Sequence, residues 1–512
     1  MKKIFNLILF SGLFMLLITA CNSSSCPEDM YMIEKASVEG YHSQYFAQEP
    51  VSPPVESFSI YLDYSGSMKT AFKDPQTAAF YNIFINSLKI SQVDFYDVDK
   101  NDVTLIENLS KSDLYTKIKD FNRFTGTNAP LDKAIALMAQ QNGEAVLITD
   151  GELWNERERN DPWAREVFGE WLKAGNTIEF FVTNHIESGK QKHLYYIFFV
   201  PKQHVGNNES IAEQLLYYLT NSIDAKDLVY THFSISNVGY KLVQEYATAK
   251  SGGVNTNASL NESTYINAGE TEGFEFQEYY LTWKDLVQYI YNAYDANGNQ
   301  IAGGDPLVSK LFVEVDKFSF FKIEEIGVKV FDVNNDFYSY LDIQRCINGT
   351  KPKFQLDENG EKVLDGENNP IVLEPGEAGC YDELGNLIGD TLFTPNTNLA
   401  EVVEVFAFDQ ESFMNNFREQ GRGEIVLKIH ENFNGSQINS ECGNLHRVDV
   451  YLKKISPDSA NENLNILSWQ GAQVAKNTSL YDSVLGALND ANPEGNVIYS
   501  FYIKTSANDY QP

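Results

Sequence analysis

The stretch IYLDYSGSMKT, residues 60–70, is a short apolar run that ends abruptly in an acidic residue, two serines and a glycine. Asp63, Ser65 and Ser67 stand at every second position, and in extended backbone such side chains point to the same face. Three small oxygen-bearing side chains at the end of a strand are ligands suited to a hard cation. The alternative is a serine–glycine turn in which Asp63 accepts hydrogen bonds from local backbone amides.

The segments around this stretch, from residue 57 to residue 224, alternate between strand-like and helix-like patterns, which indicates an α/β layer structure. Strands are predicted at FSIYLD, VDFYDV, VTLIENL, EAVLITDG, TIEFFVT and HLYYIFFV. Helices are predicted to begin at Asp74-Pro75, at Pro130, at Asp161-Pro162 and at Ser210, which forms a capping box with Glu213.

Two other loops bring oxygen ligands to strand ends. Thr127 precedes a helix in FTGTNAPLDKAI, and Asp150 closes the strand in LITDG. Ligands of open α/β sheets bind at the carboxyl ends of the strands, so we expect both side chains to approach Asp63, Ser65 and Ser67. The five residues together predict one site at that edge of the sheet.

The order and spacing of these five residues, each on its expected element, resemble the von Willebrand factor type A (vWA) domain with its metal-ion-dependent adhesion site. The resemblance implies a Rossmann-like, doubly wound α/β fold. It also implies that Ser65, Ser67 and Thr127 bind a Mg²⁺ or Mn²⁺ ion directly, whereas Asp63 and Asp150 act largely through water. An ion bound mainly by neutral hydroxyls keeps most of its positive charge and retains an open position. The carboxylate of a protein ligand is expected to fill that position.

The connection NHIESGKQKH between the last two apolar runs departs from the vWA pattern. It is shorter than a helical crossover between parallel strands needs, and it contains Ser188-Gly189, so we expect a hairpin there. In the domains that this one resembles, the last helix can shift when the metal gains an acidic ligand. The helix from Ser210 to Leu219 is therefore expected either to transmit such a shift to the junction at Asp224–Asp227 or to serve only in packing.

The chain has 512 residues, of which 43% are hydrophobic, so two to four well-packed domains are expected. Asp and Glu number 71 against 39 Lys and Arg, which gives a formal charge of −32. A charge of this sign repels nucleic acid and anionic lipid, so nucleic acid is not an expected partner.

Residues 1–21 have the pattern of a secretory signal, because two lysines precede an apolar stretch that is too short to span a membrane comfortably. The stretch ends in ITAC, which resembles the bacterial lipobox, and this resemblance implies that Cys21 becomes the lipidated first residue. The alternative is a plain secretory signal that contains a cysteine. Asn22 favours the outer membrane, on its periplasmic or its exposed face. The polar segment 22–56 is predicted to be a tether, or alternatively an ordered strap on the first domain.

Cys26, Cys346, Cys380 and Cys442 would lie in an exported setting that permits disulfides. Cys346 and Cys380 flank a polar, turn-rich insertion, residues 347–379, that contains DENGEK and DGENNP. A disulfide between the two would close this loop and contribute about 4 kcal/mol in the chain-entropy model. We therefore predict the bridge Cys346–Cys380.

Residues 225–512 are predicted to be β-rich and sandwich-like, with one module at 225–345 and a second at 346–512. Strand-like segments include LVYTHFSIS, GVKVFDV, EIVLKIH and RVDVYLKK, and helices are predicted at ESFMNNFREQ and SLYDSVLGALND. DVNNDFYSYLDI begins like a calcium-binding loop, but Phe337 stands where that loop needs glycine and Ile343 where it needs glutamate. We interpret it as a turn.

The motifs of zinc proteases, of serine-hydrolase elbows and of phosphate-binding loops do not occur, and the chain is not expected to be an enzyme. We expect a lipid-anchored protein of the cell envelope whose metal site captures an acidic group of a protein ligand, as in adhesion. The alternative is a structural or assembly subunit of an envelope, secretion or surface-appendage machine. Membrane contact is expected through the lipid anchor only.

Overall fold

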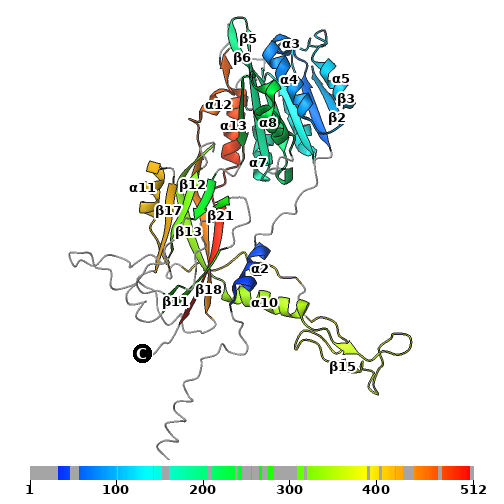
Figure 1. The fold of residues 1–512 in the computed structure, drawn as a ribbon, viewed down its shortest axis with the longest axis vertical. Helices are drawn as coiled ribbons and strands as arrows, with labels where there is room; N and C mark the ends of the chain where they lie inside the picture. Colours follow the sequence, from blue (N-terminus) through cyan, green and yellow to red (C-terminus); the bar gives the residue numbers. More distant parts are fainter. Residues whose placement is uncertain are drawn as a thin grey trace, which may run out of the picture.

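The computed structural model describes most of the chain between residues 33 and 507 (Figure 1). The described ranges are 33–45, 57–100, 102–141, 143–152, 161–204, 210–236, 240–244, 255–256, 265–267, 275–281, 308–315, 320–388, 392–402, 406–420, 422–429, 443–470 and 476–507. The predicted signal peptide 1–21 with its lipidation site Cys21, and the cysteines Cys26 and Cys442, lie outside these ranges. Within them, no helix is both long and apolar enough to cross a membrane.

The first domain is built on a seven-stranded mixed sheet with the strand order β3-β2-β1-β4-β6-β5-β7. Its strands are β1 (Phe58–Asp63), β2 (Gln92–Asp99), β3 (Asp102–Ser110), β4 (Glu144–Thr149), β5 (Thr177–Glu187), β6 (Lys190–Val200) and β7 (Tyr230–Ile235). Strand β1 runs parallel to β2 and to β4, and every other neighbouring pair is antiparallel. The predicted α/β class is confirmed.

Strands β5 and β6 form the predicted hairpin, in which Glu187 pairs with Lys190 around Ser188 and Gly189. Both turn residues have a positive φ, of 50° and 76°. The other edge of β5 pairs with β7, in the segment LVYTHFSIS that the sequence assigns to the β-rich half. The α/β sheet therefore extends beyond residue 224. The alternation of buried residues in a strand does not indicate which sheet the strand joins.

Helices cover both faces of this sheet, because its strands are apolar on both sides. They are α3 (Met68–Lys73), α4 (Pro75–Ser87), α5 (Lys111–Lys117), α6 (Leu131–Gln140), α7 (Arg165–Lys173) and α8 (Ile211–Asn221), with the short helices η1 (Lys202–His204) and η2 (Ile223–Ala225). Ile60 and Leu62 of β1 share one core with α3, α4, α5 and α8. Tyr61, which points the opposite way, belongs to the core that contains α6 and α7.

A helix from the far end of the chain completes the second of these helix layers. The hairpin between β5 and β6 supplies no crossover helix, and α13 (Ser479–Asp490) packs beside α7 instead (Figure 1). Ser483 Oγ accepts a hydrogen bond of 3.1 Å from the backbone N–H of Ala164, the N-cap residue of α7 that has no cap of its own. Arg165 binds both carboxylate oxygens of Asp490, each at 2.7 Å.

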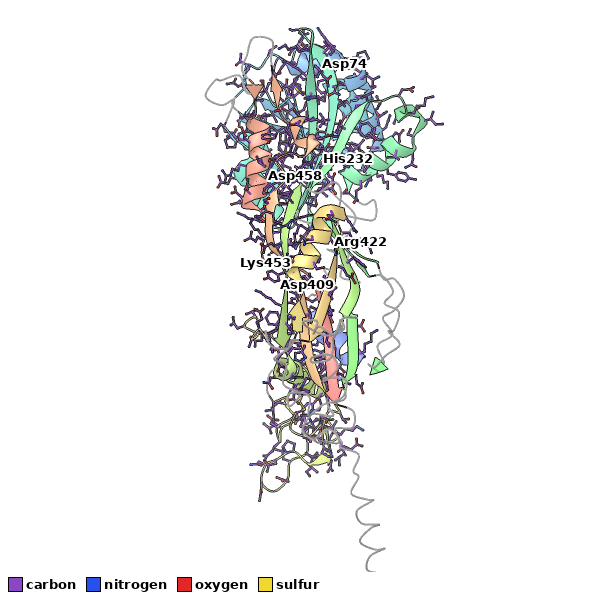
Figure 2. The ribbon with its side chains drawn as sticks, turned by 90° about the vertical axis from the view of Figure 1, so that its left-hand side faces the viewer. Asp74, His232, Asp409, Arg422, Lys453 and Asp458 are labelled. Atoms are coloured by element: carbon purple, nitrogen blue, oxygen red, sulfur yellow. A yellow bond between two sulfur atoms is a disulfide. The ribbon has the colours of Figure 1, made fainter. Side chains whose placement is uncertain are left out.

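The second half of the chain forms two five-stranded sheets, with the orders β10-β8-β12-β17-β16 and β13-β18-β21-β11-β9. Figure 2 shows them, with Asp409, Arg422 and Lys453 labelled, below the first domain, in which Asp74 and His232 are labelled. Their strands are β8 (Tyr240–Gln244), β9 (Asn255–Thr256), β10 (Tyr265–Asn267), β11 (Glu275–Leu281), β12 (Val308–Val315), β13 (Phe321–Asp332), β16 (Phe406–Phe408), β17 (Arg422–Ile429), β18 (Asn444–Pro457) and β21 (Val497–Ala507). The first sheet is antiparallel, and the second contains one parallel pair, β11 with β21.

Both sheets combine strands from the regions 225–345 and 346–512, because β12 pairs with β17 and β13 pairs with β18. The two regions are therefore shared between the sheets rather than folded as one module each. The predicted helices are present as α11 (Gln410–Gln420) and α13, and short elements α12 (Glu462–Asn465), β19 (Trp469–Gln470) and β20 (Lys476–Asn477) precede α13. Leu427 and Val450, from the two sheets, lie in the same apolar core as α7 and α13, so the core is continuous between the two halves.

Part of the predicted tether is an ordered helix, α2 (Lys35–Tyr45). It packs on α10 (Asn334–Asn348) and on β21, not on the first domain as the strap alternative expected. Tyr41 is buried and donates a 2.6 Å hydrogen bond to Asp336. The interpretation of DVNNDFYSYLDI as a turn is wrong, since α10 begins within it and Phe337 packs edge-on against Tyr41. Its buried partner Tyr41 is 295 residues away from Asp336, so local spacing could not indicate this helix.

The disulfide Cys346–Cys380 is confirmed, with the two Cα atoms 5.1 Å apart. It closes an insertion that contains the short strands β14 (Lys353–Phe354) and β15 (Val372–Glu374). In each of the predicted turns an aspartate side chain accepts hydrogen bonds from the backbone. Asp357 and Asp365 each accept hydrogen bonds from two backbone N–H groups at 2.8–2.9 Å, and Asp382 accepts one at 2.7 Å. Side-chain bonding to backbone of this kind is the ordinary role of aspartate in turns.

Candidate metal site

The first of the three predicted loops begins where β1 ends. Asp63 is the last residue of the strand and is buried, at 2% exposure. Its Oδ1 accepts from the backbone N–H of Ser65 at 2.7 Å, and its Oδ2 accepts from the hydroxyl of Thr149 at 2.7 Å. Both carboxylate oxygens therefore have protein partners, so Asp63 is suited to orienting the loop rather than to binding an ion with a free oxygen.

The two serine hydroxyls converge. Ser65 Oγ and Ser67 Oγ are 3.2 Å apart. Ser67 is the N-cap residue of α3, but its side chain makes no capping hydrogen bond. A serine at this position ordinarily bonds the first turn of its helix. Its hydroxyl is turned toward Ser65 instead.

The second loop is held against the first by backbone hydrogen bonds. Gly66 N–H donates to Gly126 O at 2.9 Å, and Gly126 N–H donates to Tyr64 O at 3.2 Å. A Cβ on Gly126 would lie 3.2 Å from the backbone oxygen of Tyr64 and 2.7 Å from Asp99 Oδ1, so a larger residue here would displace Asp99 and crowd the first loop. Thr127, the next residue, is exposed at the rim of the site.

The third loop follows β4, the parallel neighbour of β1. Asp150 is buried at 2% exposure, and its Oδ1 accepts from the backbone N–H of Glu152 at 3.1 Å. Its Oδ2 is buried and makes no hydrogen bond of standard geometry in the part of the chain that the structure describes, although the Ser67 hydroxyl lies near enough to lower the pKa of this carboxyl. A buried carboxylate oxygen without a partner is costly unless a cation or an ordered water binds it.

The electrostatics of the site favour a bound cation. Burial raises the pKa of Asp63, and the charge of Asp150 raises it further. Burial also raises the pKa of Asp150, which the nearby Ser67 hydroxyl opposes. Glu152 adds a third buried carboxyl, and burial raises its pKa although it forms an ion pair with Lys192. The charge of Asp150 raises the pKa of both Asp63 and Glu152, and a divalent ion beside Asp150 would relieve this repulsion.

The donor set fits magnesium. Ligands about 2.1 Å from an octahedral ion lie roughly 3 Å from one another, and the two serine oxygens are 3.2 Å apart. Ser65, Ser67 and Thr127 would hold the ion, with Asp63 and Asp150 behind them. Among the described residues, no group of three or more His, Cys, Asp or Glu side chains forms a metal cluster. The predicted site has only two carboxylates in its ligand set, so it belongs to a different class from such clusters.

Sequence reasoning missed two features of this site. Thr149, which binds Asp63, ends an otherwise apolar buried strand, and a buried hydroxyl needs a partner, so its position was a usable signal. Lys192 of β6 forms ion pairs with Glu152 and with Glu187, and it is distant in sequence from the first of these. No local pattern could have placed Lys192 here.

The C-terminal segment reaches the third loop. Gly151 has φ +66°, and a Cβ on it would lie 3.8 Å from Leu480 Cδ2 of α13 and 3.5 Å from the ring of Tyr195. Tyr195 Oη donates a 2.6 Å hydrogen bond to the carbonyl of Ile466. The loop that carries Asp150 is therefore packed against a segment that belongs to the second half of the chain. Helix α8, which is expected either to transmit a shift or to serve only in packing, lies in the core on the other face of the sheet.

Comparison of the chain with protein-family models, with curated proteins and with solved structures gives no match.

Proposed function

We propose that this chain is a lipid-anchored protein of the cell envelope whose first domain, a vWA-type domain, binds a protein ligand through a divalent metal ion. Ser65, Ser67 and Thr127 bind a Mg²⁺ or Mn²⁺ ion, and an acidic side chain of the ligand completes its coordination. The role is binding rather than catalysis. When bound, the ion supplies a positive charge that neutral hydroxyls leave largely uncompensated.

One observation carries this proposal: three loops from separate parts of the chain meet at the ends of β1 and β4. The hydrogen bonds between Gly66 and Gly126 bring the first two loops together, and the hydrogen bond between Asp63 and Thr149 joins the first to the third. The parallel run of β2, β1 and β4 supports the vWA assignment. The antiparallel β6 and β5 differ from that pattern close to the site, because β5 contacts α3, which follows the serine loop, and Lys192 of β6 forms an ion pair with Glu152 of the third loop.

The placement of α2 supports an orientation on the membrane. Cys21 precedes α2 closely in sequence, and α2 packs on the second half of the chain. Figure 1 shows α2 beside α10, at the lower part of the two five-stranded sheets, whereas α3, which directly follows the serine loop, lies at the top of the first domain. A lipid on Cys21 would therefore hold the metal site away from the membrane surface, where a ligand can reach it.

Affinity capture from intact cells tests the proposal. Cells that display the tagged full chain are lysed in buffer with Mg²⁺ or with a chelator, and the captured proteins are compared. We expect a partner that is retained with Mg²⁺ and lost with chelator, because its carboxylate binds the ion. A captured set that is unchanged by chelation would contradict the proposal. Recovery of a fixed complex of envelope subunits with Mg²⁺ would favour the assembly role over adhesion.

A further inference from the structure

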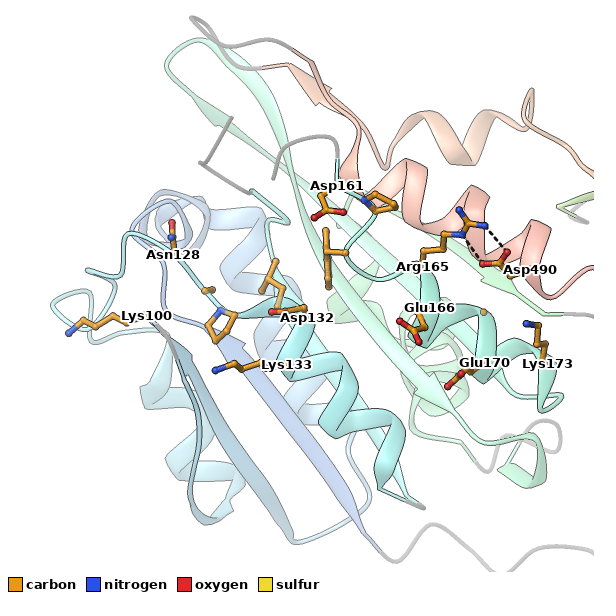
Figure 3. A pocket seen from close by; sticks show the side chains of 16 residues that line it. Lys100, Asn128, Asp132, Lys133, Asp161, Arg165, Glu166, Glu170, Lys173 and Asp490 are labelled. Carbon is orange, nitrogen blue, oxygen red and sulfur yellow. Dashed lines mark hydrogen bonds and ion pairs between the residues drawn. The ribbon is translucent and has the colours of Figure 1, made fainter. Parts of the chain in front are cut away.

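A groove of about 830 Å³ lies between α6 and α7, beside the candidate metal site (Figure 3). One end of the groove lies at the metal loops. Its lining residue Asn128 directly follows Thr127, and its lining residue Lys100 directly follows Asp99, whose carboxylate packs against Gly126. The other end lies at Lys173, the last residue of α7. A ligand bound at the metal would therefore have a path along the side of the domain.

The two walls of the groove differ in charge. The α7 wall carries Glu166 and Glu170, which are four residues apart and so lie on one face of the helix (Figure 3). Neither carboxylate forms an ion pair among the described residues, and Arg165 beside them is held by Asp490. Lys173, the other cation of α7 that lines the groove, lies at its far end, so the carboxylates dominate the middle of this wall. Asp161 adds a further carboxylate near the start of α7.

The opposite wall and the floor complete this environment. Lys100 and Lys133 lie on the α6 side, with Asp132 beside them in the first turn of the helix (Figure 3). Trp163 lines the groove and packs partly into the core below it. A partly exposed indole next to unpaired carboxylates is a favourable environment for a Lys or Arg side chain, which gains cation–π and ionic contacts together.

We propose that the groove holds the segment of the protein ligand that adjoins its metal-binding acidic residue, and that this segment carries a basic side chain. The acidic residue lies at the metal end, near Lys100, and the Lys or Arg lies against Trp163, Glu166 and Glu170. This inference rests on the proposed function, because the metal fixes the acidic end of the segment. The formal charge of −32 also attracts a basic partner over long range and so favours this occupant.

Synthetic peptides test the assignment without knowledge of the natural ligand. Each labelled peptide has about twelve residues and contains one Asp and one Arg in a background of glycine and serine. The number of residues between Asp and Arg differs from one peptide to the next. In two control sets, Gln replaces the Arg or Asn replaces the Asp. Binding to the full chain in detergent is measured by fluorescence anisotropy with Mg²⁺ and with chelator. At the best separation we expect Arg→Gln in the peptide, or Glu166→Gln with Glu170→Gln in the protein, to weaken Mg²⁺-dependent binding about five- to tenfold.

Two further sets of protein variants test whether the effect of Glu166 and Glu170 is specific to the groove. Glu411→Gln with Glu419→Gln, on the exposed side of α11, makes the same charge change far from the groove and should leave binding unchanged. The protein variant with both Glu166→Lys and Glu170→Lys should bind peptides in which Glu replaces Arg more tightly than peptides with Arg.

Three outcomes would contradict the proposal. Mg²⁺-dependent binding that changes neither with the peptide Arg nor with the two glutamates would overturn the groove assignment but keep the metal function. Absence of Mg²⁺-dependent binding by every peptide would overturn both. Dimerisation that Glu166→Lys abolishes would assign the groove to a second copy of the chain instead.

Discussion

Replacement of Asp63 by alanine is expected to lower the affinity of the protein for Mg²⁺ by about 10–100-fold, the usual cost of removing a residue that orients metal ligands. The Asp63 carboxylate fixes the Ser65 amide and the Thr149 hydroxyl, each at 2.7 Å. Its loss also removes a negative charge from a buried site. Isothermal titration calorimetry measures the effect. The protein used lacks residues 1–21 and still contains every residue that the structure describes.

A matched variant separates this effect from a general loss of charge. Asp224→Ala removes a carboxylate from the exposed end of the first domain and should leave the Mg²⁺ affinity unchanged. Circular dichroism should show both variants folded. Equal affinities for Asp63→Ala and the wild type would remove the metal-site interpretation of the serine loop.

Replacement of Val484 by aspartate is expected to lower the free energy of unfolding by about 4 kcal/mol or more, the range reached when an unpaired charge is buried. Val484 is 1% exposed and lies in the apolar core that α13 shares with α7. A carboxylate at this position has no cation to pair with in that core, so α13 must leave its place or bury the charge. Urea unfolding followed by tryptophan fluorescence measures the change.

The same charge on the exposed side of α13 provides the control. Asn489→Asp adds a carboxylate to the last turn of the same helix at an exposed position. It also removes the hydrogen bond from Asn489 Nδ2 to Leu485 O, so it should change stability by about 1 kcal/mol or less. If Val484→Asp has no greater effect than Asn489→Asp, then α13 does not pack on the first domain. This result would contradict the conclusion that one apolar core is continuous between the two halves of the chain.

The parts of the metal site that sequence could predict are those that short-range rules determine. Asp63, Ser65 and Ser67 lie within five residues, so local structure alone brings them together. They lie on a turn in which Asp63 accepts from the Ser65 amide, as the turn alternative expected, and not on extended backbone with a period of two. Asp150 ends an apolar strand, and the carboxyl ends of parallel strands meet at one edge of a sheet. The hairpin between β5 and β6 followed from the short length of its connection and from the turn residues Ser188 and Gly189 within it.

The contacts that sequence reasoning missed join residues far apart in the chain. The N-terminus of α7 is capped by Ser483, and no local signal links the amide of Ala164 to a serine 319 residues later. The helix SLYDSVLGALND was predicted from its period, but the period indicates only that one face is buried and not what buries it. The same limit explains β7, whose alternation fits either half of the chain, and Lys192, whose partner Glu152 lies on another loop.

The position of a bound manganese ion tests the central claim most directly. Crystals grown with Mn²⁺ and measured near the manganese absorption edge should give one strong anomalous peak in the first domain, within bonding distance of the Ser65, Ser67 and Thr127 hydroxyl oxygens, about 2.0–2.2 Å. A carboxylate from a ligand or a neighbouring molecule, or water, should fill the remaining positions. No peak at these hydroxyls, with Mn²⁺ in excess, would contradict the account.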